Sequence, residues 1–240
     1  MISFPFPFLL IMRPPTPSIS LDFTKTHGTL LFPKLPPPSP TQAHIDIIRY
    51  TWEHLCGIRL DHDDPTISPS HAFGLAFYNA LFESDPTLRF LFTNIVQQAR
   101  AFAGFISYLA RMPTQSNIRE MNALKRKGVG ALTFPELVTE VSNTEHEPVT
   151  EDFRYQLHEL GAKHYYYGVN TVHFDSIGRA LMKALKERLG KEFLPEIEEA
   201  WKRSYAYSAY YMKIGLESAQ DEWRQHRNES MQTKQSCTIQ

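Results

Sequence analysis

Apolar residues recur every three or four positions from about residue 41 to residue 218, and no part of this window alternates as a convincing β-strand would. Ile45, Ile48, Trp52 and Leu55 form the first such stripe. This spacing places the apolar side chains on one face of a helix, which must be buried against other helices. The sequence therefore predicts an all-α fold of about seven helices. Ala, Gly and Ser on several faces favour crossed packing over a parallel bundle.

Residues that commonly begin or end helices divide residues 41–218 into separate helices. A second helix is expected to begin at Ser68 to Ser70, where serine side chains can cap it, and to end at Asp85-Pro86. Further helices are expected from Ile95 to about Arg111, from Thr150 onward, from Phe174 to Gly190, and from Pro195 onward.

The two ends and one internal segment differ from the helical window. Ten of the 17 prolines fall in residues 1–40, a composition that removes backbone donors and favours disordered, extended chain. The composition of residues 112–150 indicates a long insertion, and that of residues 219–240 indicates a frayed helix end and polar tail. We therefore expect one domain at residues 41–218, between two polar or proline-rich ends.

Charge and cysteine content exclude several classes of partner. The net charge of −1 and the pI of about 6.8 give no reason to expect nucleic acid or an anionic membrane. Cys56 and Cys237 are too few and too far apart for a disulfide framework or a zinc site, so we expect a reducing, cytoplasmic location. The apolar start, MISFPFPFLLIM, is too short to span a membrane and has no preceding basic residue, which weakens a signal-peptide interpretation.

His164 is the best candidate for chemistry. It shares a helix face with Leu160 and Leu157, one and two turns earlier, so its ring is expected to point into the apolar interior as neutral imidazole. One ring N–H can reach the Leu160 carbonyl, which leaves the lone pair of the other nitrogen free, as in an axial metal ligand. The commoner alternative is a core histidine satisfied by a side chain or water. His173, at the start of the next helix, is expected to be solvated or to cap that helix.

No second His, Cys or carboxylate lies one turn away on the His164 face, so a metal there would need a macrocycle for its other ligands.

A series of short motifs follows one another between Leu160 and Tyr205. In order, they are L-G-x-x-H, Y-G-V, H-F-x-x-x-G-x-A-L, L-G and A-W-x-x-x-Y. This pattern resembles the F, G and H helices of globins, especially single-domain globins, neuroglobin-like proteins and the haem domain of flavohaemoglobins. Upstream, RYTWEHL resembles the first globin helix, FYNALFESDPTLRFLF the B and C helices, and QQARAFAG the E helix.

The resemblance covers residues 44–111 and 153–218 and implies the globin fold, a three-on-three helical sandwich. The chain differs from the globin pattern in two places. It has extra residues at 56–67 and the 112–150 insertion between the E and F helices. The resemblance implies haem b (iron protoporphyrin IX) as cofactor and His164 as the iron ligand. Trp52 and Trp201 match helix-packing positions. The other implied haem contacts are Phe92 at the haem edge, Leu157 and Leu160 on the proximal side, Val169 after the F helix, and Tyr78, Gln98 and Phe102 on the distal side. Gln97 is the competing distal register, and Tyr78 has the alternative of being one more core aromatic.

By the same resemblance, the expected function is reversible binding of oxygen, nitric oxide or carbon monoxide, with oxygen storage or transport as the default and no enzyme activity. One alternative is a nitric oxide dioxygenase or oxygen-scavenging enzyme with a separate reductase, because no flavin or nicotinamide domain follows. Phe174 stands where flavohaemoglobins have a tyrosine, which weakens this alternative. Another is a haem-based sensor or interaction module that uses the insertion or the N-terminal segment. A globin fold without haem also stays open, and the sequence carries no signal for the oligomeric state.

Overall fold

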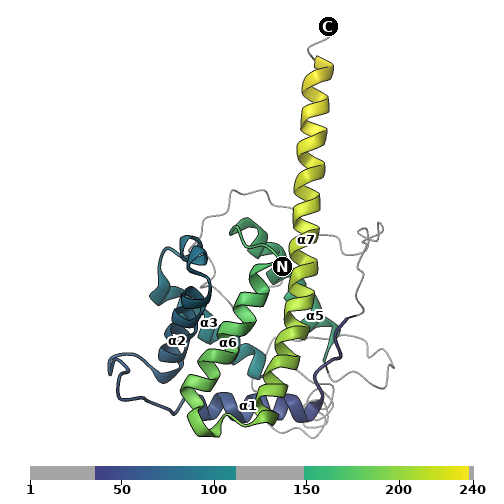
Figure 1. The fold of residues 1–240 in the computed structure, drawn as a ribbon. Helices are drawn as coiled ribbons and strands as arrows, with labels where there is room; N and C mark the ends of the chain where they lie inside the picture. The colour runs from purple at the N-terminus through teal and green to yellow at the C-terminus, as the bar shows by residue number, and fades with distance from the viewer. Residues whose placement is uncertain (1–35, 112–148, 238–240) are drawn as a thin grey trace, which may run out of the picture.

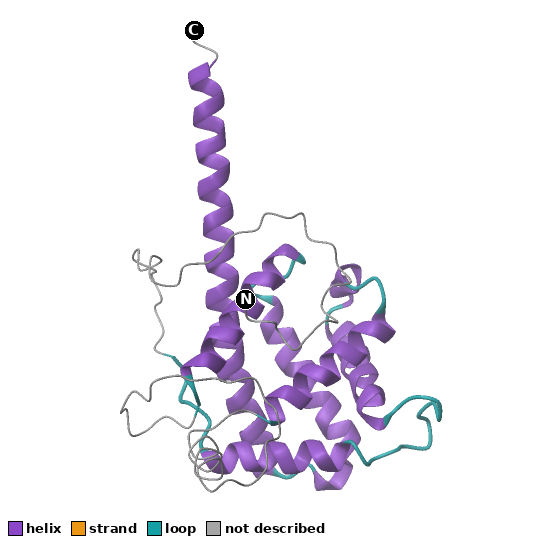
Figure 2. Ribbon diagram, turned by 180° about the vertical axis from the view of Figure 1, so that it is seen from behind, coloured by secondary structure: helices purple, strands orange, loops and turns teal. Residues whose placement is uncertain are grey.

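The computed structural model describes residues 36–111 and 149–237. The described elements are helices, without a β-strand, so the all-α prediction is confirmed (Figure 1, Figure 2). Most of the segment expected to be disordered, and nearly all of the expected insertion, lie outside the described residues. The elements are α1 (Gln42–Leu55), α2 (Pro69–Ser84), η2 (Pro86–Leu91), α3 (Ile95–Ala110), α5 (Glu151–Tyr166), α6 (His173–Leu189), η3 (Gly190–Glu192) and α7 (Pro195–Cys237).

Four of the α-helices begin at a side chain that accepts a hydrogen bond from the backbone of the first turn. The caps are Thr41 for α1, Ser68 for α2, Asn94 for α3 and Thr150 for α5. Each cap satisfies one of the backbone N–H groups that a helix leaves unpaired at its start. The expected starts at Ser68 and Thr150 are thereby confirmed.

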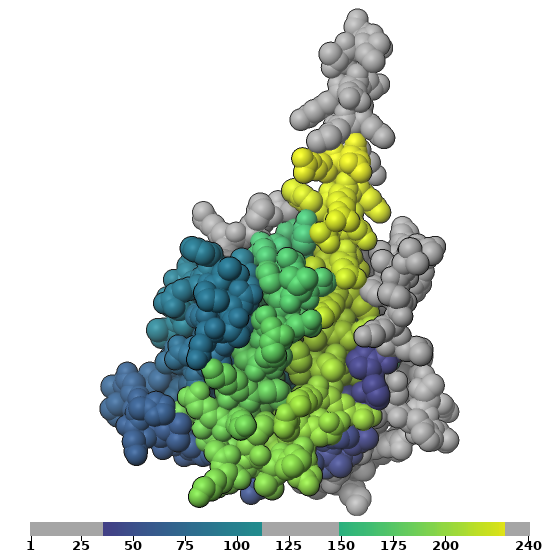
Figure 3. Space-filling model, in the orientation of Figure 1, coloured from purple at the N-terminus to yellow at the C-terminus, as the bar shows by residue number. Residues whose placement is uncertain are grey.

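The helices cross one another around a shared core. α2 packs against α3 and α6, α5 packs along α7, and α1 packs across α7. Figure 3 shows α6 and α7 side by side on one face of the molecule. At the crossing of α2 and α3, a Cβ atom added to Gly74 would lie 2.2 Å from the carbonyl oxygen of Ala99, so only glycine permits this approach. The expectation of close, crossed packing through small residues is confirmed at this contact.

Both predicted helix-packing tryptophans are buried. Trp52 on α1 is 4% exposed, meets Phe73 edge to face at 5.4 Å between ring centroids, and donates from Nε1 to the Ser107 hydroxyl at 2.9 Å. Trp201 on α7 is 2% exposed. An indole buries a large apolar area, so both residues tie their helices to the core.

The last helix is longer than the sequence indicated. We expected the last helix to fray near residue 218, but α7 continues to Cys237 and projects past the other helices (Figure 1). Its polar residues indicated a tail, yet no Pro or Gly follows Gly215, so nothing in the chain breaks the helix.

The extra residues between α1 and α2 are held by Arg188 of α6, which forms two hydrogen bonds to Asp63 and one to the Ile58 carbonyl.

In the part of the chain that the structure describes, no helix has the length and apolar character that a membrane crossing requires.

Candidate functional site

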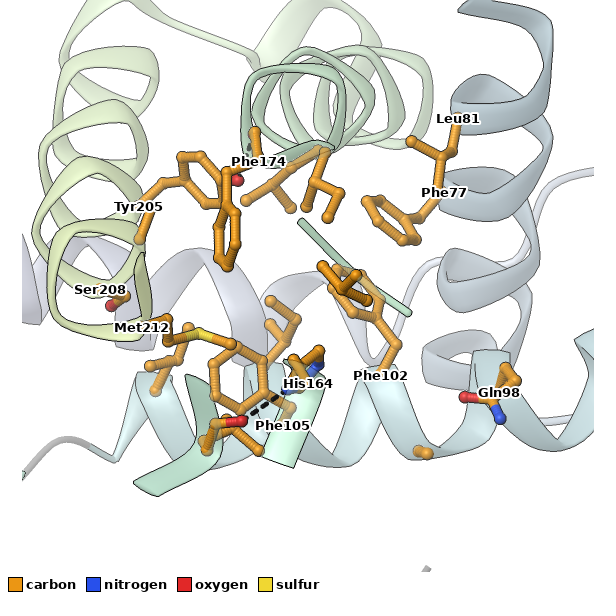
Figure 4. Close-up of a pocket in the computed structure, with 18 of the residues that line it drawn as sticks. Phe77, Leu81, Gln98, Phe102, Phe105, His164, Phe174, Tyr205, Ser208 and Met212 are labelled. Atoms are coloured by element: carbon orange, nitrogen blue, oxygen red, sulfur yellow. Dashed lines mark hydrogen bonds between the residues drawn. The ribbon is translucent and has the colours of Figure 1, made fainter. Parts of the chain in front are cut away.

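A cavity of about 170 Å³ lies among the helices, and its wall includes side chains from all six described α-helices and from η2. Most of the lining is aliphatic or aromatic (Figure 4). One buried water molecule needs only about 10–15 Å³. The cavity is therefore large enough for an organic ligand and has the apolar character typical of cofactor sites.

His164 lines this cavity near the end of α5. Its Nδ1 lies 2.7 Å from the carbonyl oxygen of Leu160, one turn earlier, as the sequence predicted (Figure 4). A carbonyl oxygen can only accept, so Nδ1 carries the proton and donates, and Nε2 holds the lone pair. Among the described residues, Nε2 has no hydrogen-bond partner.

The surroundings of His164 keep its ring neutral. Desolvation by burial lowers the pKa of the imidazole, and the hydrogen bond to Leu160 opposes that shift only in part. A neutral ring whose Nδ1 is held by a carbonyl presents Nε2 as an electron-pair donor. That is the state required of a metal-ligating histidine.

The backbone around His164 is fixed from both sides. Three residues earlier, Gly161 packs against α7 so closely that an added Cβ atom would lie 1.9 Å from the Met212 carbonyl oxygen. Immediately after the helix, the N–H groups of Tyr167 and Val169 donate to the His164 carbonyl oxygen at 3.1 and 3.2 Å. The orientation of the imidazole is therefore set by the crossing of α5 and α7 and by the turn that ends α5.

An aromatic group forms another part of the wall. Tyr78 of α2 lies edge to face with Phe92, at 5.0 Å between ring centroids, and with Phe102 of α3, at 6.2 Å. Phe102 also stacks on Phe77 at 3.8 Å. All of these residues line the cavity, so the structure brings Tyr78, Phe92 and Phe102 together with His164 around one space.

Tyr78 is 5% exposed, and burial raises the pKa of its hydroxyl above the usual value. The phenol is therefore protonated and able to donate. Among the described residues the hydroxyl makes no hydrogen bond, although a buried polar group normally has a partner. Tyr78 packs like a core aromatic, as the alternative interpretation held, and it also carries a donor at the cavity wall.

The two candidate glutamines of α3 differ in position. Gln98 lines the cavity, whereas Gln97 is exposed and is absent from the lining. Figure 4 shows Gln98 set apart from the cluster that contains His164, Phe102 and Phe105. Of the two registers, the geometry favours Gln98, at the edge of the cavity.

Leu160 and Val169 line the cavity, but Leu157 does not. Leu157 is 1% exposed and belongs to the hydrophobic core. It shares the face of His164, yet it lies seven residues earlier, about 10 Å along the helix axis, beyond the edge of the cavity. The placement of Leu157 at the site is therefore corrected.

His173 does not line the cavity either. Its Nδ1 accepts a hydrogen bond from the Asn170 N–H at 3.2 Å, just before α6 begins. The first turn of α6 has no side-chain cap, so His173 does not cap the helix; its partly exposed ring holds the preceding turn instead. Among the described residues, His164 is the one histidine in the cavity lining.

Sequence reasoning missed the wall that α6 and α7 contribute. Tyr205 of α7 lines the cavity and donates from its hydroxyl to the Phe174 carbonyl oxygen at 2.5 Å. Its stripe was recognised as apolar, but helical spacing alone cannot distinguish packing against protein from facing a cavity. The other lining residues that were not expected at the site include Phe105, Trp201, Ser204, Ser208 and Met212.

This arrangement fits a flat apolar macrocycle that carries a metal. Within the described residues, no group of three or more His, Cys, Asp or Glu side chains could hold a metal ion. A metal bound to His164 Nε2 would take its remaining ligands from a non-protein group, and aromatic and aliphatic walls suit the faces of a porphyrin. His164, Phe92 and Val169 would hold haem here, with Tyr78 as a polar group at the wall.

Comparison with known proteins agrees with this chemistry. A family model described as Globin matches residues 120–212. The chain is similar to a neuroglobin of Dissostichus mawsoni, with 26% identity over 175 residues that cover 71% of this chain and 88% of the relative. It is also similar to an anaerobic nitrite reductase of Brassica napus, with 37% identity over 60 residues that cover 25% of this chain and 37% of that relative.

Among solved structures, the fold is similar to an engineered carbene transferase made from a putative nitric oxide dioxygenase of Rhodothermus marinus. The TM-score is 0.51 at 18% identity, and the match covers 78% of this chain and 99% of the other. This likeness concerns the fold, which is the globin fold predicted from the sequence. The family-model match, the sequence relatives, the fold and the histidine in the cavity lining all support a globin-family protein that binds haem and a gas.

Proposed function

We propose that this protein binds haem b through His164 Nε2 and, with haem bound, reversibly binds oxygen and other diatomic gases. The observation that carries the proposal is the His164–Leu160 hydrogen bond. It fixes the imidazole in the tautomer whose Nε2 has a free lone pair and no partner among the described residues. Haem, when bound, would supply an iron that can take a diatomic gas as a ligand.

The chain's own residues would then divide into two roles. His164 donates its electron pair and is kept neutral by burial, which lowers its pKa. Phe92, Val169 and Leu160 line the same cavity as His164. These side chains would exclude water and hold the cofactor in one orientation.

Tyr78 is proposed as the hydrogen-bond donor to the gas, with Gln98 as a second donor at the edge of the cavity. A hydrogen bond to a partly charged group contributes about 1.5–3 kcal/mol, and each 1.4 kcal/mol corresponds to about a factor of ten in affinity. Hydrogen-bond donors act most strongly on a partner that carries negative charge, and oxygen held by haem would carry more of it than carbon monoxide would. Donors at this position therefore favour oxygen and slow its release, which suits storage or scavenging better than rapid delivery.

Nitric oxide dioxygenation requires a reductase, whereas reversible oxygen binding does not. Dioxygenation converts nitric oxide, oxygen and one electron into nitrate, so it needs a reductase for repeated turnover. The donors at Tyr78 and Gln98 are compatible with both roles, and we propose oxygen binding as the principal one. A sensor or interaction role would depend on the insertion or the N-terminal segment, which lie outside the described residues.

The experiment is a comparison of oxygen equilibrium with nitric oxide consumption by the full chain loaded with haem. Reversible oxygen binding, with nitric oxide consumption that stops after one equivalent per haem even when a reductase is supplied, supports the proposed role. Sustained nitrate formation that scales with haem content and reductase would replace it with the enzyme role. Failure to bind oxygen in the ferrous state would contradict both.

We further propose residues 41–218 as the globin domain, in which the 112–150 segment joins the E and F helices, α3 and α5. On the basis of its two cysteines, too few for a disulfide framework, we place the protein in the cytoplasm.

A further inference from the structure

The first helix begins with a hydrogen-bond arrangement that a histidine side chain completes. Thr41 is the N-cap of α1, and its hydroxyl oxygen accepts from the His44 backbone N–H at 3.4 Å. In return, the Nδ1 atom of His44 lies 3.1 Å from the Thr41 backbone nitrogen and 2.6 Å from the Thr41 hydroxyl oxygen. This reciprocal pattern is a capping box, which ordinarily uses Glu or Gln three residues after the cap. In α1, an imidazole takes that place.

The backbone N–H of Thr41 fixes the protonation state of the imidazole. A backbone N–H can only donate, so Nδ1 of His44 must hold a lone pair, and the proton of the neutral ring lies on Nε2. A second proton on Nδ1 would leave the Thr41 N–H facing another donor. The threonine hydroxyl could reverse and accept from Nδ1, but the backbone N–H would lose its acceptor. The capping box therefore depends on a neutral ring.

The residues that enter α1 are held against α7. The carbonyl oxygen of Ser39 accepts from Arg203 Nε at 3.1 Å, and Pro40 is buried. The N–H of Thr41 belongs to the peptide unit that joins Pro40 to Thr41, so the capping box fixes the next unit of the same chain. Residues 39–41, which we call the entry segment, are therefore held at two points, one on α7 and one on α1.

The charges around His44 come from α7. Burial and the positive charge of Arg203 lower the pKa of the imidazole, and the negative charge of Glu199 opposes them in part. Helices α2 and α3 also pack against α1, but no charged group among their described residues acts on this ring. Arg203 is also the residue that holds the Ser39 carbonyl. A proton on His44 would therefore break one attachment of the entry segment and repel the cation that forms the other.

We propose that His44 is a pH-sensitive latch, which holds the entry segment while its ring is neutral and releases it when the ring takes up a proton. Because burial and Arg203 make protonation harder in the folded chain, the latch contributes its full stability above the unfolded-state pKa of about 6.5. This contribution is lost as the pH falls through the lower pKa of the folded state. Neither His44 nor the entry segment lines the cavity, so the latch does not depend on the proposed haem and gas binding.

An NMR titration of the full chain from about pH 7.5 to about pH 5 tests the latch, because this range brackets histidine titration. The Thr41 amide signal should shift with the same midpoint as the His44 ring, since one hydrogen bond joins them. Below that midpoint, protection of the Thr41 amide from hydrogen exchange should fall by about fivefold or more, as expected for the loss of a helix cap. Protection of the Arg203 Nε–H should fall with it. A Thr41 amide that does not respond while His44 titrates would overturn the proposal.

His44→Gln is the most informative variant, because glutamine at this position can close the same capping box and does not titrate. It should keep the entry segment held at both ends of the pH range. His44→Ala should leave the Thr41 amide unprotected at both ends. His62→Gln, which removes an exposed histidine, is the control and should reproduce the wild-type transition. An acid-induced loss of protection in His44→Gln equal to that of the wild type would show that another group controls the segment and would contradict the proposal.

Discussion

Gly161 of α5 and Met212 of α7 are in direct backbone contact. A Cβ atom added to Gly161 would lie 1.9 Å from the Met212 carbonyl oxygen, closer than any side chain can approach. Since Gly161 precedes His164 by less than one helical turn, the same contact that joins the two helices sets the position of the imidazole. The crossing of α5 and α7 therefore determines both how the two helices pack and where the His164 ring lies.

Replacing Gly161 with alanine should force α5 away from α7. Overpacking of a buried contact costs about 1–3 kcal/mol, and backbone atoms can yield less than flexible side chains, so we expect a loss at the upper end of that range. Urea denaturation measures the change. Gly104 offers a matched control, because an added Cβ atom on this helical glycine meets nothing within 4 Å. Gly104→Ala should stabilise the protein by about 0.5–1 kcal/mol, and the same sign for Gly161→Ala would refute the account of the crossing.

Asp63→Asn should destabilise the protein, because it leaves Arg188 as an unpaired buried charge. The two side chains are 5% and 1% exposed, and Arg188 also holds the Ile58 carbonyl. Loss of one partner in a buried ion pair costs roughly 3 kcal/mol. Glu83→Gln at the exposed Lys183 pair is the control and should cost about 1 kcal/mol or less. Equal effects of the two substitutions in thermal or urea unfolding would contradict the structural role of Arg188.

The Asp63–Arg188 ion pair predicts that the free energy of unfolding depends on pH. Hydrogen bonds from Arg188 hold the pKa of Asp63 below its usual value, against the opposing effect of desolvation. Because the pKa is lower in the folded state, the pair stabilises the fold fully above the unfolded-state pKa of about 3.9. This contribution is lost as the pH falls from that value through the folded-state pKa. The difference in free energy of unfolding between wild type and Asp63→Asn should therefore shrink below about pH 4, and a difference that grows there would be inconsistent with the ion pair.

Leu157→Ala tests the corrected position of Leu157. Truncation of a fully buried leucine costs about 2–5 kcal/mol, since it removes apolar contacts and leaves a void. The haem spectrum of the folded variant should match that of the wild type, because Leu157 is absent from the cavity lining. Leu160→Ala is the matched comparison, and there we expect an altered spectrum. A spectral change in Leu157→Ala alone would restore Leu157 to the site.

Tyr78→Phe tests the proposed donor. Removal of the hydroxyl deletes one hydrogen bond to oxygen while the ring contacts with Phe92 and Phe102 are retained. Oxygen dissociation, measured by stopped flow, should become at least about tenfold faster, and carbon monoxide dissociation should change much less. Tyr50→Phe, at a residue that is 71% exposed, should leave both rates unchanged. An unchanged oxygen rate in Tyr78→Phe would show that the phenol does not contact the gas.

The features that the sequence predicted correctly are mostly local. The caps at Ser68 and Thr150 and the His164–Leu160 bond each join residues within one turn, so spacing alone encodes them. Leu157 was misplaced because the limit of the cavity along α5 is set by other helices. The part of the cavity wall that α6 and α7 contribute was missed for the same reason.

The length of α7 was underestimated for a different reason. Polar composition after residue 218 was interpreted as a tail, although the chain has no helix breaker there. Composition reports what a segment can bury, whereas propensity decides whether an exposed helix continues. The two signals conflict in this segment.

The central claim is that His164 Nε2 is the axial ligand of haem, and His164→Gly with added imidazole tests it most directly. We predict that the wild type shows a Soret band that shifts when carbon monoxide is added to the ferrous protein. His164→Gly should lose that spectrum and regain it when free imidazole fills the space left by the side chain. A wild type that gains no Soret band after haem is supplied, or a His164→Gly variant with the wild-type spectrum in the absence of imidazole, would contradict the claim.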